Sequence, residues 1–484
     1  MKVCLCSAEC VPYVKTGGLA DITGSLPKSL EHLGCEVKVF IPLYNTIATL
    51  FHGLLQNTEF EDVPVKIGDV THTFNLWEGV LPDSDVNVYF IDCQHYYHRG
   101  KPYTDDKDED ERFIFFQLAI LETLQRLKWS PDILHCNDWQ TSLLPVYLKT
   151  TFAWDELFKD TASILTIHNI GYQGRFSKNS IFSAGLSFDN FYPEGPFEMD
   201  GAFCFLKAGI LYSEAITAVS PTYAKEIQTA EYGAGMEGVL AVRKKDLSGI
   251  LNGIDTTIWN PETDDKIPFN YSEKKLKNKY RIRAELIKEA EFTNPNIPIV
   301  GMVSRFAGQK GFDLIEPIIS ELLNIPVNMI VLGSGDKKLE KFFEIAAASF
   351  KGKFIEYIGF NDELAHLITA GSDMFLMPSL YEPCGLNQMY SLAYGTVPVV
   401  RKTGGLADTV KDFHEYNEEG NGFSFEDATP QALYLTVKRA ADIYYDKIKW
   451  PAIMKRGMQE DFSWDHSAKE YVELYKKYEK RKEF

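Results

Sequence analysis

The stretch KVCLCSAECVPYVKTGGLADITGSLPKSLEHLGCEVKVFIPL, residues 2–43, predicts the fold of the first part of the chain. Its outer segments, KVCLCSAE and EVKVFIPL, are short and apolar, as is typical of buried strands. The segment ITGSLPKSLEHLG between them has a helical pattern that ends at Gly34. Strand, helix and strand in this order form a βαβ unit, so we expect an α/β protein built on a parallel sheet.

The same alternation continues along the chain and then restarts. Strands are expected at DVNVYFID, DILHC, SILTIHN and AITAVS, and helices at ERFIFFQLAILETLQRL, TSLLPVYLKTT and PTYAKEIQ. The segment GILNGIDTTIWNPETDDKIPFNYS is rich in Gly, Asn, Asp and Pro, which predicts a linker. After it, strands are expected at IPIVGMVSRF, VNMIVLGSGD, FIEYIGF, DMFLMPS and TVPVVRK, helices at DLIEPIISELLN and CGLNQMYSLAYG, and a loop leading into a helix at TGGLADTV. The pattern therefore predicts two doubly wound domains.

These patterns place an N-terminal Rossmann-like domain at 1–255, a C-terminal Rossmann-like domain at 256–462 and a terminal helix at 463–484. The terminal segment WDHSAKEYVELYKKYEKR is amphipathic. Its apolar residues share one stripe: Ala468, Tyr471, Val472, Tyr475 and Tyr478. We expect this helix to pack across existing structure, back onto the N-terminal domain.

Composition excludes several classes of partner. The 484 residues carry a formal net charge of −18, which argues against nucleic acid and acidic membranes as partners. No apolar run approaches the roughly 18 residues of a membrane span, and no removable signal or transit segment is expected. The eight cysteines follow no metal-binding or disulfide pattern, so we expect buried free thiols and a reducing, cytoplasmic location.

The heptapeptide KTGGLAD, Lys15–Asp21, follows the first expected strand, at the sheet edge where doubly wound proteins bind ligands. Gly17 and Gly18 allow close backbone approach, the next helix offers N–H donors, and Lys15 adds a positive charge. By itself the motif is equally consistent with a structural turn. The same seven letters return at Lys402–Asp408.

The second domain carries a more specific pattern. SRFAGQKG places Arg305 and Lys310 on one loop after a strand, which suits a diphosphate. In SLYEPCGLNQMYSLAYG, a helix is expected to begin at about Gly385, with amides through Asn387 facing an anion. Glu382 just before it would repel phosphate and is expected to accept hydrogen bonds from neutral hydroxyls. Hydroxyls beside a diphosphate indicate a nucleotide sugar.

The chain is similar over nearly its whole length to bacterial glycogen synthases and plant starch synthases. The resemblance rests on KTGGLAD, SRFAGQKG, EPCGLNQMYSLAYG and TGGLADTV, joined in order by HCNDWQTSLLP, TIHNIGYQGRF, GAGMEGVL, ILNGIDTTIWNPETD and DFSWDHSAKEY. It implies a GT-B fold, with two Rossmann-like domains facing across a cleft. It also implies transfer of glucose from ADP-glucose to the non-reducing 4-hydroxyl of an α-1,4-glucan with retention. The partners are then a nucleotide sugar and an α-glucan, with no cofactor and no metal.

The resemblance also assigns site residues. Those implied in catalysis are Lys15, Asp138, His168, Arg305, Lys310 and Glu382. Those implied in substrate binding are Gly17, Gly18, Asp21, Asn169, Asn252, Phe360, Tyr381, Cys384, Gly385, Leu386 and Asn387.

The family's roles carry over as follows. Domain closure would bring Lys15 against Arg305 and Lys310 around the departing diphosphate, with Asp21 positioning the sugar or the loop. His168 would hydrogen-bond the transferring glucose, and Asp138 would lie near the reacting centre or the acceptor.

Glu382 would bind glucose hydroxyls, and Cys384 would pack behind the sugar. Asn252 matches a donor-site asparagine of the family. Phe360 stands where the family commonly has a tyrosine that stacks on adenine.

Two positions depart from the pattern of related enzymes. Related retaining transferases often carry a second glutamate eight positions after the first, where this chain has Tyr390, as is usual in this branch. Histidine is common before the aspartate of the HCNDW segment, where this chain has Asn137, which bears on the acceptor contacts nearby.

Other interpretations stay open from the residues alone. His168 also fits a buried core histidine, Asp138 fits a helix cap, and HYYH at 95–98 resembles a metal pair, although the family has an aromatic loop there. ADP-glucose is expected because KTGGLAD follows the bacterial and plant pattern. The alternatives are a GT-B glucosyltransferase that uses UDP-glucose or a small acceptor, a glucan phosphorylase, for which no pyridoxal-phosphate lysine motif is present, and a non-catalytic glucan-binding protein. No pattern indicates an oligomeric state.

Overall fold

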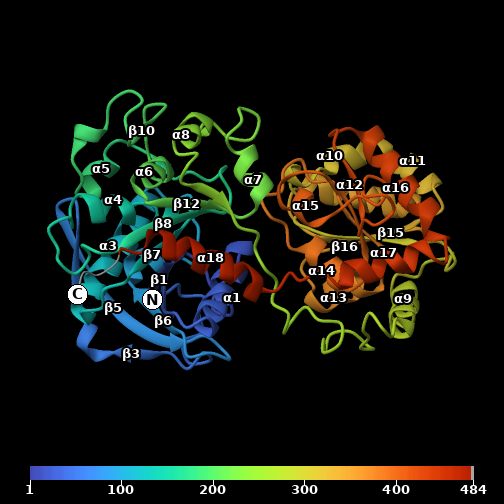
Figure 1. The fold of residues 1–484 in the computed structure, drawn as a ribbon, viewed down its shortest axis with the longest axis horizontal. Coiled ribbons are helices and arrows are strands. Elements are labelled where there is room, and N and C mark those ends of the chain that lie inside the picture. The colour runs from blue at the N-terminus through green and yellow to red at the C-terminus, as the bar shows by residue number, and fades with distance from the viewer. Residues whose placement is uncertain (481–484) are drawn as a thin grey trace. The chain divides into compact units, whose positions relative to one another are not determined.

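The structure is a computed structural model that describes residues 1–480, and the chain forms two units (Figure 1). Unit 1 comprises Met1–Val219, Ala224–Gly253 and the chain from Trp464 onward. Unit 2 comprises Ser220–Tyr223 and Ile254–Ser463. The expected boundaries lie within two residues of these, except that Ser220–Tyr223 were expected in the first domain.

Unit 1 is built on a ten-stranded sheet of order β13-β12-β8-β7-β1-β2-β6-β5-β3, with β4 paired to β5. Its parallel strands are β1 (Lys2–Cys6), β2 (Glu36–Pro42), β6 (Asn87–Asp92), β7 (Ile133–Asn137), β8 (Ala162–Ile167), β12 (Ala215–Ala218) and β13 (Leu247–Gly249). Strand β1 is central, because Val3 aligns with Val37 on one side and with Ile133 on the other. Its consecutive residues Val3, Cys4, Leu5 and Cys6 are all buried, so both faces of β1 are covered.

An antiparallel extension at one edge of this sheet was not predicted. It consists of β3 (Leu55–Asn57), β4 (Val63–Ile67) and the long β5 (Val70–Val80), which pairs with β6. A separate small sheet joins β9 (Arg175–Phe176), β10 (Glu198–Met199) and β11 (Ala202–Cys204). Both were missed because their strands are short or half exposed.

Helices complete unit 1. They are α1 (Gly18–His32), α2 (Gln94–Tyr97), α3 (Glu109–Leu127), α4 (Leu144–Lys149), α5 (Ser180–Ser183), α6 (Phe205–Tyr212), α8 (Glu237–Val242) and α18 (Trp464–Tyr478), while α7 (Pro221–Glu226) begins in unit 2 and ends in unit 1. Short 3-10 turns lie at Thr58–Phe60, Trp139–Thr141 and Phe188–Asn190.

The terminal helix α18 packs against α1, as the red and blue ribbons of Figure 1 show. Of the predicted stripe, Ala468, Tyr471 and Tyr475 are buried, whereas Val472 and Tyr478 are only half-buried. The Tyr475 hydroxyl lies 2.7 Å from His135 Nδ1, so the helix is tied to the centre of the sheet.

Unit 2 is built on a six-stranded parallel sheet of order β16-β15-β14-β17-β18-β19. The strands are β14 (Ile299–Val303), β15 (Asn328–Gly333), β16 (Phe354–Ile358), β17 (Met374–Met377), β18 (Val397–Arg401) and β19 (Phe423–Phe425). Consecutive residues of a strand belong to different apolar cores. Val300 and Val331 lie in one core, and their neighbours Ile299 and Ile330 lie in the other. Both faces are covered, as in a doubly wound sheet.

Its helices are α9 (Lys277–Glu289), α10 (Phe312–Ile315), α11 (Ile319–Asn324), α12 (Lys337–Ser349), α13 (Asp362–Gly371), α14 (Asn387–Ala393), α15 (Gly404–Thr409), α16 (Pro430–Tyr444) and α17 (Lys449–Met458). Short 3-10 turns lie at Gly308–Lys310 and Glu316–Ile318. Helices α9, α12, α13, α16 and α17 were not predicted.

The segment predicted to be a linker is instead packed into unit 2. Trp259 stacks between the rings of His366 and Tyr390, with centroids 3.8 and 3.9 Å apart. The buried Asp264 carboxylate lies 2.8 Å from His366 Nδ1 and accepts a hydrogen bond from Tyr394. The Gly, Pro and Asn content correctly predicts irregular backbone, but aromatic and acidic side chains anchor that backbone to the domain.

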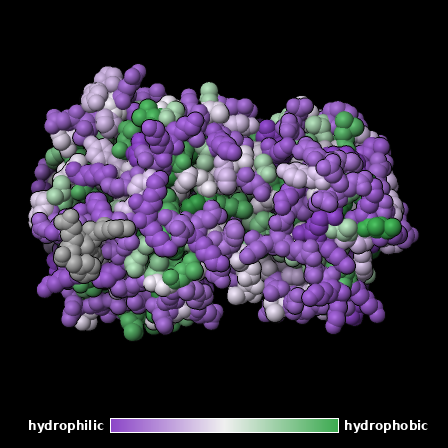
Figure 2. All heavy atoms as spheres, in the orientation of Figure 1, coloured by the Kyte–Doolittle hydropathy of each residue, from purple (hydrophilic) through white to green (hydrophobic). Residues whose placement is uncertain are grey.

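The surface drawn in Figure 2 is mainly hydrophilic, with apolar residues in small groups. Among the described residues, none of the helices combines the length and apolar character needed to cross a membrane. All eight cysteines are buried free thiols, as expected, and Cys4 and Cys6 share one face of β1 with their sulfur atoms 3.7 Å apart.

Candidate functional site

Three segments with predicted site residues leave neighbouring strands of unit 1. Lys15 follows β1, Asp138 follows β7 and His168 follows β8, and these three strands are adjacent and parallel. The carboxyl ends of parallel strands lie at one edge of a sheet, so the fold gathers these segments there.

The KTGGLAD loop of unit 1 is held by Glu9, a buried residue that sequence reasoning missed. Its carboxylate accepts hydrogen bonds from the main-chain N–H of Thr16, from the Thr16 hydroxyl at 2.7 Å and from Gly17 N–H at 3.3 Å. The Tyr103 hydroxyl donates a further hydrogen bond to Glu9. The signal for it is a carboxylate placed directly after an apolar strand.

The side chains of this loop are exposed. Lys15 Nζ lies 2.7 Å from Asp21 Oδ1, so the two predicted residues pair with each other within the motif. Helix α1 begins at Gly18, and a Cβ atom added to Gly17 would meet nothing within 4 Å. The backbone at Gly17 is therefore open to a ligand.

Asp138 has a strained backbone with φ of 56°, a conformation that non-glycine residues adopt rarely. Its Oδ1 accepts a hydrogen bond from the main-chain N–H of His168 at 2.7 Å. Burial raises the pKa of this carboxyl to about 7, against the opposing effect of the His168 and Asn169 amides, while nearby Glu9 raises it further. Asp138 therefore links two strand ends and is not simply a helix cap.

The His168 ring is partly exposed and held by Asn137. Its Nε2 lies 2.8 Å from the amide oxygen of Asn137. Burial, and to a smaller degree His135, lower the pKa of His168 to about 3, so the ring is neutral near pH 7. A neutral, partly exposed imidazole suits hydrogen bonding to a sugar better than a purely structural core role.

Two predicted asparagines of unit 1 differ in their contacts. Asn169 Oδ1 accepts a hydrogen bond from Gly171 N–H at 3.0 Å. Asn252 follows β13 and is buried, yet its amide oxygen has no hydrogen-bond partner among the described residues. A buried acceptor without a partner is costly unless a ligand satisfies it, which favours a binding role for Asn252.

In unit 2, Lys310 and Glu382 are in direct contact at the carboxyl ends of the adjacent strands β14 and β17. Lys310 Nζ lies 2.7 Å from Glu382 Oε2, and the buried Ser379 hydroxyl donates to the same oxygen at 2.9 Å. Arg305 lies exposed on the same loop as Lys310. A cavity of about 30 Å³ beside them is lined by Lys310, Ser379 and Asn387, among others.

The segment after Glu382 corrects one expectation. Helix α14 begins at Asn387, not at about Gly385, because Gly385 has φ of +72° and Leu386 is the N-cap. The Asn387 side chain donates to Val303 O at 2.7 Å and is thus tied to β14.

The remaining predicted residues of unit 2 divide by exposure. Cys384 is buried, and its main chain packs directly against Gly405. Tyr381 O accepts a hydrogen bond from Gln309 Nε2 at 3.2 Å. Phe360 follows β16 with 90% of its surface exposed, so its ring is available for stacking.

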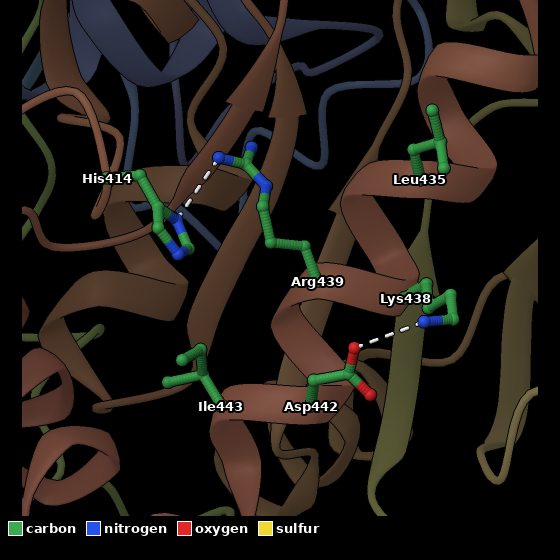
Figure 3. A pocket seen from close by; sticks show the side chains of 6 residues that line it. All are labelled: His414, Leu435, Lys438, Arg439, Asp442 and Ile443. Atoms are coloured by element: carbon green, nitrogen blue, oxygen red, sulfur yellow. Dashed lines mark hydrogen bonds and ion pairs between the residues drawn. The ribbon is translucent and has the colours of Figure 1, made fainter.

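A second depression of unit 2 lies elsewhere. It holds about 260 Å³ and is lined by His414, Leu435, Lys438, Arg439, Asp442 and Ile443 (Figure 3). Arg439 lies 3.2 Å from His414 and 2.9 Å from Asp412, and Lys438 lies 3.3 Å from Asp442. None of the predicted site residues lines this depression.

Comparison with known proteins finds that the chain is similar to glycogen synthases and to the starch synthase catalytic domain. Residues 2–242 match the family model of the starch synthase catalytic domain, and residues 284–445 match that of glycosyl transferases group 1. Glycogen synthase of Thermosipho melanesiensis is 44% identical over 479 residues, which is 99% of each chain. Glycogen synthase of Pseudothermotoga lettingae is 42% identical over 490 residues and the full length of both chains.

Two solved structures resemble the fold. The catalytic domain of starch synthase IV from Arabidopsis thaliana, bound to ADP and acarbose, superposes with a TM-score of 0.91 at 33% identity over 99% of each chain. Sucrose-phosphate synthase from Thermosynechococcus elongatus superposes with a TM-score of 0.58 at 16% identity over 98% of each chain, which is a likeness of fold alone.

Proposed function

This chain belongs to the glycogen synthase family, and from that premise we propose that its donor is ADP-glucose and its acceptor the non-reducing 4-hydroxyl of an α-1,4-glucan, with retention of configuration. The family, the GT-B fold and the glycosyltransferase activity expected from the sequence are confirmed. The enzyme is thus a glycogen or starch synthase. Eight free thiols favour a cytoplasmic location.

The observation that carries the proposal is the contact between Lys310 and Glu382, at 2.7 Å. A cation and a carboxylate side by side match the two chemical parts of a nucleotide sugar, because the ammonium suits the diphosphate and the carboxylate accepts from sugar hydroxyls.

The adenine end of the donor has its own support. A starch synthase structure contains ADP, and this chain offers the exposed Phe360 ring where the family has a stacking tyrosine. An aromatic face is worth about 1–3 kcal/mol per stacked base. The unsatisfied Asn252 oxygen supplies an acceptor for a donor N–H or O–H group.

The reaction then depends on charge stabilisation. As the bond between glucose C1 and the diphosphate oxygen breaks, Lys310 and Arg305 meet the negative charge that grows on the leaving group. Lys15 supplies a third cation once it exchanges its Asp21 partner for phosphate. The neutral His168 ring holds glucose, and the departing phosphate accepts the proton of the attacking hydroxyl.

A second carboxylate does not take part. Tyr390 occupies the position where related transferases have a glutamate, and its ring is buried against Trp259. Retention therefore follows from attack on the face that the diphosphate leaves, without a covalent glycosyl-enzyme. On this proposal side-chain cations provide the charge that a metal ion provides in other transferases, so EDTA leaves turnover unchanged.

The test uses labelled ADP-glucose and UDP-glucose, each offered separately with glycogen, and counts label in polymer. We expect ADP-glucose to be the better donor and Lys310→Ala to lower kcat on the order of 10²-fold. The matched control is Lys337→Ala, which removes a lysine that also pairs with a glutamate, Glu340 at 2.6 Å, but lies on α12. A preference for UDP-glucose would overturn the donor, and glucan binding without nucleotide release would favour the non-catalytic alternative.

A further inference from the structure

Asn137 stands where related chains commonly have histidine, and its side chain is held in one orientation. Its Nδ2 donates to the main-chain oxygen of Cys6 on the neighbouring strand at 3.0 Å. Its own main-chain N–H donates to the Thr141 hydroxyl at 2.7 Å. Because the amide nitrogen is committed to Cys6, the amide oxygen is directed to the other side, where His168 lies.

The contact between Asn137 and His168 determines which ring nitrogen carries the hydrogen. Asn137 Oδ1 lies 2.8 Å from His168 Nε2, and an amide oxygen can only accept. Nε2 must therefore donate. Since burial keeps the pKa of the ring at about 3, the ring carries one hydrogen near pH 7 and Nδ1 has a free lone pair. No partner of Nδ1 is recorded among residues 1–480.

The next residue holds His168 at a second point. The Asp138 carboxylate accepts a hydrogen bond from the main-chain N–H of His168 at 2.7 Å, and the backbone of Asp138 itself has the strained φ of 56°. Two consecutive residues at the end of β7 thus restrain both the main chain and the ring of one histidine at the end of β8. The titratable groups that interact with Asp138 or His168 are His135, Glu9 and Tyr103.

We propose that Asn137 is a positioning residue that fixes His168 as the Nε2–H tautomer, so that Nδ1 accepts a hydrogen bond from a hydroxyl of the transferring glucose. The inference rests on the proposed function for its last step, the contact with glucose. Its first step, the tautomer, depends only on the protein. In this chain an amide oxygen restrains the ring, and an amide oxygen has no tautomer of its own.

The two steps are tested separately. In the full chain labelled with ¹⁵N-histidine, the His168 signal, assigned by its loss in His168→Gln, reports the tautomer without substrate. We expect Nε2–H in the unmodified protein and a mixture of tautomers in Asn137→Leu, which removes the acceptor. With donor and glycogen, Asn137→Leu should lower kcat about 10-fold, the scale of one lost hydrogen bond, with a smaller change in KM.

A second variant changes the electrostatics and gives up the hydrogen bond that Asn137 Nδ2 donates to Cys6 O. Asn137→Asp has the same shape and retains an acceptor, but its carboxylate favours the protonated ring and raises the pKa of His168. A protonated ring cannot accept a hydrogen bond through Nδ1. The fall of kcat on the acidic side of its pH profile, the acidic limb, should therefore occur at higher pH in this variant. The new carboxylate also raises the pKa of the neighbouring Asp138, so the His168 ¹⁵N signal, followed against pH in this variant, assigns a shift of the limb to the ring.

The matched control is Asn328→Leu, which removes a buried asparagine of unit 2 whose Nδ2 donates to Asn294 O at 2.8 Å. It should leave the His168 signal and kcat unchanged. An Nδ1–H tautomer in the unmodified protein would overturn the proposal, as would unchanged kcat and tautomer in Asn137→Leu together with an unmoved acidic limb in Asn137→Asp. If neither donor labels glycogen, the proposed function fails, while the tautomer result still decides the role of Asn137.

Discussion

The two copies of KTGGLAD have identical letters and different surroundings. In unit 1 the motif forms an exposed loop, with Lys15 paired to Asp21 inside the motif at 2.7 Å. In unit 2, Lys402 pairs with Glu415 at 2.9 Å and Glu426 at 3.1 Å, both outside the motif. The first lysine pairs inside its own exposed loop, while the second joins separate segments of unit 2.

The glycines differ even more. Nothing lies within 4 Å of a Cβ placed on Gly17, whereas a Cβ on Gly404 would lie 1.9 Å from Glu382 O and one on Gly405 would lie 2.1 Å from Cys384 O. Glycine in the first copy leaves room for a ligand. Glycine in the second copy allows close contact with the segment that carries Glu382. The motif itself therefore specifies a strand-to-helix turn, and the neighbouring backbone decides its use.

The largest difference should appear in the stability of Gly404→Ala and Gly17→Ala. Gly404 has φ of +45° as well as the backbone clash, so alanine there should lower the free energy of unfolding by about 3 kcal/mol or more. Gly17 has an extended backbone with φ of −156°, so alanine there should change the free energy of unfolding by less than about 0.5 kcal/mol. Urea unfolding of both variants measures this.

Enzyme activity distinguishes the same two glycines further. Gly17→Ala should fold normally and lose kcat/KM for the donor, because its new methyl group occupies the space left for ligand. Equal stability losses in the two variants would mean that the copies are equivalent turns and would remove the contrast.

The next effect is kinetic and separates the two lysines. Lys15→Ala should lower kcat on the order of 10²-fold, because it removes one cation from the departing diphosphate. Lys402→Ala removes exposed ion pairs worth about 0–1 kcal/mol each and should leave kcat within about twofold. Initial rates with labelled donor and glycogen measure both. A loss of kcat of similar size in both variants would assign the second copy a part in the reaction that its contacts do not indicate.

The sequence predicts the parts of this molecule that depend on local patterns. Apolar runs locate the parallel strands, because these strands are covered on both faces. Glycines and cations after those strands locate Lys15, Arg305 and Lys310, because carboxyl ends of strands form the ligand edge. The irregular backbone after Gly249, up to Ser272, is also predicted, from Gly, Pro and Asn.

Contacts between residues far apart in the chain are not predictable in this way. Glu9 and Tyr103 are 94 positions apart, and His168 and Asn137 are 31 apart, so no local pattern joins them. Trp259 looks like a linker residue until His366 and Tyr390 enclose it. The sequence thus indicates which residues follow the ends of the parallel strands, and the fold decides which neighbours orient them.

The smallest effect concerns the final aspartate of each copy. Asp408 accepts hydrogen bonds from the main-chain N–H of Thr222 at 2.8 Å and from its hydroxyl at 2.6 Å, all within unit 2. Asp408→Ala leaves both donors without this acceptor and should cost about 1–2 kcal/mol of local stability. Asp21→Ala breaks an exposed pair with Lys15 and should cost less than about 1 kcal/mol.

Hydrogen exchange of the peptides that contain Thr222 and Thr16 measures each site in its own unit. Faster exchange at Thr222 in Asp408→Ala, with little change at Thr16 in Asp21→Ala, is expected because Glu9, not Asp21, holds the Thr16 amide. Strong deprotection at Thr16 in Asp21→Ala would instead show that the aspartate stabilises both turns, and the two copies would then differ only in exposure.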